Sequence, residues 1–143
     1  MNGYSHHGKA VHLAHSYERR LLQLTMLLGC IVPLTGGTLG IVLGTGMLGT
    51  PNGDPGLDSH VRYLSGLLLG IGLGYVSIIP TIEKQGSRAA LLTAIVVLGG
   101  FARLYSHIHD SWPATPMTYA LVMELGVVPV LYLWQRRIAR ICC

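Results

Sequence analysis

The chain has 143 residues, of which 50% are hydrophobic and 11% are charged, with a formal net charge of +4. Soluble domains carry about a quarter charged residues, so this chain has too little polar material to cover a surface that faces water. The apolar residues also stand in long blocks, which is typical of helices that face lipid and predicts an integral membrane protein.

Residues 1–20 are predicted to form a cytoplasmic segment before the membrane. Val11, Ala14 and Tyr17 recur at helical spacing, which predicts an interfacial helix along the membrane surface. No A-x-A cleavage pattern follows the first apolar block, so we expect that block to be a retained span rather than a signal peptide. One interpretation of the four histidines in this segment is a metal site, and the simpler interpretation is a solvated tail. These histidines are His6, His7, His12 and His15.

Four apolar blocks each come close to the roughly 20 residues that a helix needs to cross a bilayer. The predicted spans are residues 21–43, 61–79, 88–106 and 116–134. They form a membrane domain over residues 21–136, which a basic cytoplasmic tail follows at residues 137–143.

The basic residues indicate the orientation of these spans. They occur before the first span, between the second and third, and after the fourth, whereas the loops at 44–60 and 107–115 contain no lysine or arginine. Because basic residues favour the cytoplasmic side, both termini are predicted to lie in the cytoplasm. The predicted fold is an all-α polytopic membrane protein, a bundle of four antiparallel transmembrane helices. The basic residues are Lys9, Arg19, Arg20, Lys84, Arg88, Arg136, Arg137 and Arg140.

Glycines at steps of four in the first two spans predict close packing between them. Without a hydrophobic drive in lipid, helices associate through close backbone contact at small residues. We therefore expect the two sets to face each other, although glycine is also generally common in membrane helices. The sets are Gly36, Gly40 and Gly44, and Gly66, Gly70 and Gly74.

Charged residues gather at the predicted outer ends of the spans. Asp58 and Arg62 precede Gly66 at steps of four, so both are predicted to continue the packing face of the second span. Arg103 and Glu124 lie deeper, and their side chains lean toward each other if the third and fourth spans are antiparallel neighbours. An unpaired charge in hydrocarbon is costly, so we predict an Arg103–Glu124 ion pair that Asp58, Arg62 or Tyr63 extends. It is either a structural clasp or part of a ligand or partner site.

No catalytic motif and no strong metal motif is present. His60, His107, His109 and Asp110 are weak metal candidates, and a solvated histidine loop explains them without a metal ion. Three cysteines, Cys30, Cys142 and Cys143, have no zinc or redox spacing and are expected to be unpaired thiols. The positive charge fits attraction to anionic lipid and does not require nucleic acid.

The segments LDSHVRYLSG, VVLGGFARLYS and ELGVVPVLYLWQRRIAR resemble a family of bacterial four-helix inner-membrane proteins, domain of unknown function 4345. The likeness covers about residues 18–140 and implies the same fold and orientation. No activity is assigned to this family, so the resemblance implies no mechanism.

Two functions remain open at this stage. One is a non-enzymatic accessory or structural subunit that packs against larger proteins in a bacterial inner-membrane complex. The alternative is a protein that binds a lipid, a quinone or another small molecule at an outward-facing polar site. That site would contain Asp58, His60, Arg62, Tyr63, Arg103 and Glu124, and no other cofactor is predicted. An enzyme or transporter has little support, because the spans show neither repeats nor a pair of broken helices.

Overall fold

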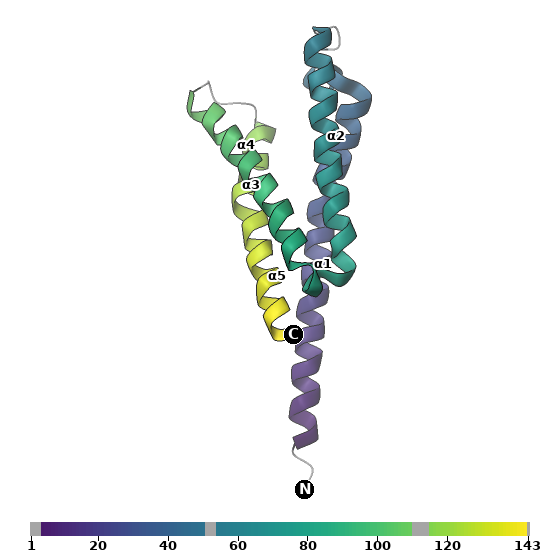
Figure 1. Cartoon of the computed structure of the whole chain (residues 1–143), viewed down its shortest axis with the longest axis vertical. Coiled ribbons are helices and arrows are strands. Elements are labelled where there is room, and N and C mark those ends of the chain that lie inside the picture. The colour runs from purple at the N-terminus through teal and green to yellow at the C-terminus, as the bar shows by residue number, and fades with distance from the viewer. Residues whose placement is uncertain (1–3, 51–53, 110–114, 143) are drawn as a thin grey trace. The chain divides into compact units, whose positions relative to one another are not determined.

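Every element that the structure describes is helical (Figure 1). This computed structural model describes the backbone of residues 4–50, 54–109 and 115–142, and the side chains of residues 16–50, 54–109 and 117–140. The elements are α1 (Tyr4–Leu43), η1 (Gly44–Leu48), α2 (Pro55–Ile78), η2 (Ile79–Lys84), α3 (Gly86–His109), α4 (Thr115–Val122), η3 (Met123–Val127) and α5 (Val128–Cys142).

Four helical stretches are long and apolar enough to cross a membrane, which confirms the prediction of an all-α chain with four potential spans. They are longer than the predicted spans because helix formation does not stop where the apolar residues end. Residues 4–20 continue directly into the first span as part of α1, and residues 137–142 belong to α5. The stretches are Ser16–Leu48, Pro55–Lys84, Gly86–His109 and Met117–Arg140.

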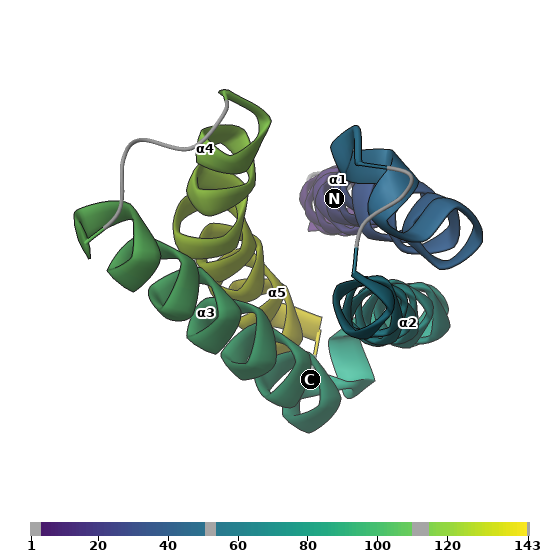
Figure 2. The same cartoon turned by 90° about the horizontal axis from the view of Figure 1, so that it is seen from above.

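The chain divides into two compact units, each described by itself. The central unit is residues 24–80, and the terminal unit combines residues 1–23 with residues 81–143. In the central unit the membrane part of α1 lies beside α2, and in the terminal unit α3 lies beside η3 and α5 (Figures 1 and 2).

Two glycines and one capping residue shape the turn between α1 and α2. Gly44 and Gly49 have φ angles of +55° and +78°, a left-handed conformation that glycine adopts without steric cost. Asp54 then accepts a hydrogen bond from the Leu57 N–H at 3.0 Å, with Pro55 in the first turn of α2. This is the usual chemistry of a helix start.

The predicted contact between the two glycine sets is wrong for Gly66 and Gly70. A Cβ atom built at either position meets no atom within 4 Å beyond the neighbouring residues and backbone of its own helix. At Gly37, in contrast, a Cβ atom would lie 2.7 Å from the main-chain nitrogen of Leu69, and at Gly40 it would lie 2.7 Å from the Cβ atom of Ser65. The glycines of α1 therefore do contact α2, but they contact a different face of α2 from the one that contains Gly66 and Gly70.

Helix geometry explains this difference. Each residue turns a helix by about 100°, so positions at steps of four drift by roughly 40° per step and reach about 160° between Asp58 and Gly74. The close contacts of α2 instead alternate between steps of four and three, the spacing that keeps one face toward a partner helix. These contacts are at Asp58, Arg62, Ser65, Leu69 and Gly72.

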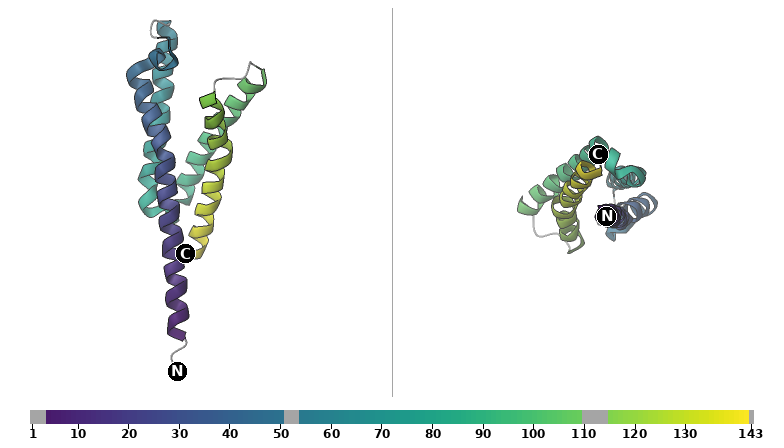
Figure 3. Two further views of the ribbon diagram at one scale, coloured as in Figure 1. Left: turned by 180° about the vertical axis from the view of Figure 1, so that it is seen from behind. Right: turned by 90° about the horizontal axis from the view of Figure 1, so that it is seen from below.

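The terminal unit is held together by apolar packing and by one buried amide. Gln135 of α5 is 1% exposed, and its Nε2 donates a hydrogen bond to the carbonyl oxygen of Ile82 at 2.7 Å. Ile82, Ala89 and Ile138 of the same unit are also buried. The same unit contains an ion pair between Arg19 of α1 and Glu83 of η2, with Nε and Oε2 separated by 3.1 Å. Figure 3 shows α3 and α5 of this unit from two further directions.

Candidate functional site

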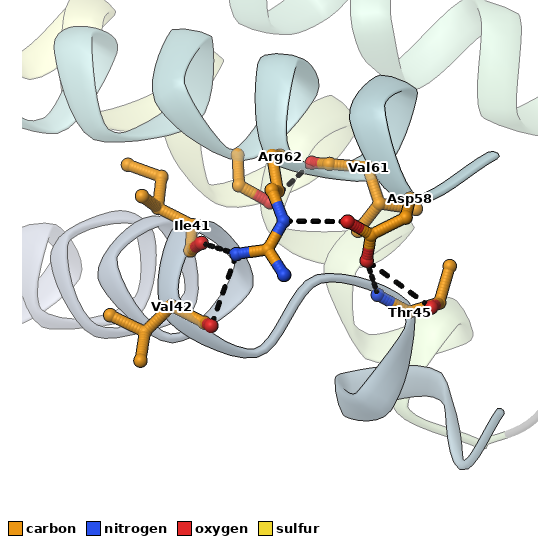
Figure 4. A network of polar contacts seen from close by, with 7 residues as sticks. Ile41, Val42, Thr45, Asp58, Val61 and Arg62 are labelled. Carbon is orange, nitrogen blue, oxygen red and sulfur yellow. Dashed lines mark hydrogen bonds and ion pairs between the residues drawn. The ribbon is translucent and has the colours of Figure 1, made fainter. Parts of the chain in front are cut away.

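A network of polar contacts joins the start of α2 to the end of α1 (Figure 4). The Oδ2 atom of Asp58 accepts a hydrogen bond from Nε of Arg62 at 2.7 Å. Its Oδ1 atom accepts from the main-chain N–H of Thr45 at 2.9 Å and from the Thr45 hydroxyl at 3.2 Å. Nη1 of Arg62 donates to the carbonyl oxygens of Ile41 and Val42, the latter at 3.1 Å.

These contacts give hydrogen-bond partners to backbone groups where α1 ends and η1 begins at Gly44. The last carbonyl groups of a helix have no partner within the helix, and they form the negative end of its dipole. Ile41 and Val42 are in the last turn of α1, so the guanidinium of Arg62 caps that end. The carboxylate of Asp58 meanwhile satisfies the N–H of Thr45 where η1 begins. A charged pair at this position is therefore explained by the chain's own backbone.

Gly44 is expected to tolerate no side chain, because a Cβ atom there would overlap Asp58 and lie 2.8 Å from Nη2 of Arg62. Gly44→Ala should lower the free energy of unfolding in mild detergent by about 2 kcal/mol, through left-handed strain and overpacking together. Gly49→Ala adds only the strain and Gly46→Ala adds neither, since both positions have open space and only Gly49 has a positive φ. Equal losses for Gly44→Ala and Gly49→Ala would contradict the network.

The predicted ion pair between Arg103 of α3 and Glu124 of η3 is present. Nε of Arg103 donates to Oε2 of Glu124, and Nη2 donates to Oε1, both at 3.1 Å. Nη1 lies 3.1 Å from the sulfur of Met117. Parallel bonds of this kind fix the orientation of both groups as well as their separation. The side chains are 33% and 21% exposed, so the pair is only partly open.

Glu124 stands in a π-helical turn, a feature that the sequence analysis missed. Within η3, the N–H of Val128 bonds to the carbonyl oxygen of Met123, five residues before it. Pro129 follows directly; it lacks an N–H, and its ring would clash with the carbonyl group four residues earlier in a regular helix. The wider turn relieves that clash, so Pro129 was the available signal. Turns of this kind are frequent at functional sites.

Beside this ion pair, α3 and η3 approach each other closely. A Cβ atom built at Gly100 of α3 would lie 3.1 Å from Cβ of Glu124 and 2.7 Å from Cδ2 of Leu125. At the adjacent Gly99 there is open space. Only a residue without a side chain at position 100 allows α3 to come this near, and that short separation lets Arg103 reach Glu124.

The other predicted site residues do not join either cluster. His60 and Tyr63 are exposed and lie about 200° and 100° around α2 from Arg62. The ring of His109 contacts that of Tyr105, with centroids 4.4 Å apart. The two ion pairs belong to different units, so the extension of the Arg103–Glu124 pair by Asp58, Arg62 or Tyr63 stays a prediction.

No group of three metal-ligating side chains occurs among the residues that the structure describes. Asp110, one of the weak metal candidates, lies outside those residues, as do the side chains of the N-terminal histidines and of Cys142 and Cys143. Cys30 is a free thiol in α1.

Four helices that are long and apolar enough to cross a membrane, with charged side chains paired inside each unit, indicate the class of multi-pass α-helical membrane proteins. The chain belongs to the family called domain of unknown function (DUF4345), whose match extends over residues 20–135. Both ion pairs fall within the matched residues. No curated protein and no solved structure matches the chain.

Proposed function

We propose that this protein is a non-enzymatic accessory subunit of a bacterial inner-membrane complex. In this proposal the four helices form an antiparallel bundle with both termini in the cytoplasm, and the bundle packs against larger integral membrane proteins. Two of the three groups of basic residues support the orientation at the end where α3 begins and α5 ends, since Arg88, Arg136, Arg137 and Arg140 all occur there.

The observation that carries the proposal is that Arg62 and Arg103 both bind groups within the chain. Arg103 gives two hydrogen bonds to one carboxylate, and Arg62 gives its own to Asp58 and to the end of α1. An arginine that binds a ligand must exchange its bound water for that ligand. Arg62 and Arg103 instead already form hydrogen bonds that link one helical element to another. A clasp within the bundle accounts for every contact of both groups, and buried pairs often serve to specify an arrangement.

Small residues that the intrachain contacts leave free support a partner helix. Gly66 and Gly70 of α2 form a small-xxx-small pair with open space above both. Such a pair lets another helix approach closely in a membrane, where van der Waals contact drives association. Large apolar side chains beside them, Tyr63, Leu67 and Leu73, are also exposed.

The test is extraction of the tagged chain from its native membrane in mild detergent, followed by mass spectrometry of whatever co-purifies. We expect stoichiometric recovery of at least one larger membrane protein. Gly66→Leu with Gly70→Leu should abolish that recovery without changing the unfolding midpoint of the chain, whereas Gly99→Leu, also in open space, serves as a matched control.

Recovery of the chain alone, in repeated preparations, would overturn the proposal. Recovery of the chain with a stoichiometric lipid or quinone, lost on replacement of Arg103, would instead support the alternative of a small-molecule site around Arg62, Arg103 and Glu124.

A further inference from the structure

A pocket of about 570 Å³ opens where α3 begins and α5 ends, within the terminal unit. These two helix ends lie side by side in Figures 1 and 3. None of the three ion pairs described above takes part in it. Its lining consists of Gly86, Ser87, Ala90, Tyr132, Gln135, Arg136, Ala139 and Arg140.

Three features of this pocket favour an anion. Arg136 and Arg140 stand one helical turn apart on α5, and the guanidinium carbon of Arg136 lies 6.0 Å from the centre of the Tyr132 ring. That ring holds the charge beside the pocket by a cation–π contact. Gly86 and Ser87 belong to the first turn of α3, whose N–H groups have no acceptor within the helix. The first turn contains no acidic residue that would neutralise the positive end of the helix dipole.

A buried acceptor in the same lining adds a second requirement. The side chain of Gln135 is 1% exposed, and its Nε2 is fixed by the carbonyl oxygen of Ile82. The opposite atom, Oε1, is buried without a hydrogen-bond partner among the described residues. An unsatisfied buried acceptor is costly, so a ligand that also brings a hydrogen-bond donor is favoured over one that brings only negative charge.

We propose that this pocket binds a phosphate ester that carries a hydroxyl or ammonium donor close to the phosphate. Arg136, Arg140 and the first turn of α3 hold the phosphate, and Gln135 accepts the donor. Headgroups such as phosphoglycerol and phosphoethanolamine have this chemistry, and so do small soluble glycerol phosphates. The inference is independent of the proposed subunit role, because it needs only this chain.

The experiment measures binding to the purified full-length chain by native mass spectrometry in mild detergent. The probes are dioleoyl phosphatidylethanolamine and dioleoyl phosphatidylcholine, two zwitterions that share their acyl chains, phosphate and net charge but differ in the ammonium donor. Dioleoyl phosphatidylglycerol is added as the anionic probe for the charge variants below. We expect phosphatidylethanolamine to bind more tightly than phosphatidylcholine by on the order of tenfold. Glycerol 3-phosphate, added as a competitor, identifies the source: displacement of the lipid indicates a soluble phosphate, and no displacement indicates a membrane lipid.

Two charge-matched variants separate a pocket from general attraction to anionic lipid. Arg136→Gln with Arg140→Gln removes two charges that line the pocket, whereas Arg88→Gln with Arg137→Gln removes two that do not. The first should weaken phosphatidylglycerol binding by on the order of tenfold or more, since each basic residue near an anionic headgroup adds to its attraction, and the second should leave it nearly unchanged. Ala139→Leu, which fills the pocket and keeps all charges, should also abolish binding.

Equal losses for the two charge variants would overturn the inference, because the basic residues would then act only as a diffuse positive surface. Equal binding of phosphatidylethanolamine and phosphatidylcholine would overturn the role given to Gln135. Loss of partner recovery in the earlier experiment would leave both of these outcomes unaffected, so the two proposals fail separately.

Discussion

Gly37→Ala is expected to lower the free energy of unfolding by about 3 kcal/mol, one of the two largest effects that we predict. Its Cβ atom would lie 2.7 Å, 2.8 Å and 2.9 Å from N, Cβ and Cα of Leu69. Two of these are main-chain atoms, which no side-chain rotation can move away, so α1 and α2 must separate. Denaturation of the chain from mild detergent micelles by a harsher detergent measures the change.

Gly70→Ala is the matched control, since it adds the same methyl group to α2 at a position with open space. Alanine has a higher helix propensity than glycine by up to about 1 kcal/mol, so this variant should be unchanged or slightly more stable. A loss at Gly70 as large as that at Gly37 would mean that α2 presents its glycines to α1 after all.

Glu124→Leu is expected to have a comparable effect, about 3 kcal/mol, for an electrostatic reason. It removes the acceptor of both bonds from Arg103 and leaves a guanidinium, 33% exposed, without its carboxylate partner in a membrane helix. The same denaturation assay measures the loss. Val122→Leu, two residues away at a site that is 58% exposed, should have almost no effect. Loss of Glu124 without loss of stability would show that Arg103 has another partner.

The sequence was sufficient to predict the helices and one of the contacts between them. Long uncharged blocks determine where a chain can cross a membrane, because hydrocarbon requires apolar side chains and satisfied backbone groups. The Arg103–Glu124 pair was predictable for a related reason, since a charge in a span must find an opposite charge and each of these residues had few candidates.

The face that α2 turns toward α1 was not predictable from the glycines alone. Steps of four look like one stripe in the sequence, but over four steps they drift by about 160°, nearly to the opposite side of the helix. The sequence does contain the correct spacing in Asp58, Arg62, Ser65 and Leu69, yet a serine and a leucine are common in any span. The close contacts at these positions depend on the whole hairpin, including the left-handed turn at Gly44.

The polar contacts of the basic end were missed for a different reason. Gln135 and Glu83 stand among other polar residues near span ends, where solvated side chains are ordinary and carry no signal. Only their three-dimensional neighbours, the carbonyl oxygen of Ile82 and the guanidinium of Arg19, identify them as internal contacts. The π-helical turn at Glu124 likewise follows from Pro129 only when the helix is known to continue past it.

The most direct test of the clasp is the coupling between Arg103 and Glu124 in a lipid bilayer. A double-mutant cycle of Arg103→Met, Glu124→Leu and the combined variant, followed by unfolding in bicelles, isolates the interaction of the two side chains. We predict a favourable coupling of about 1–2 kcal/mol, so that the combined variant is more stable than the sum of the single losses implies. A coupling of zero, with each single replacement tolerated, would contradict the account.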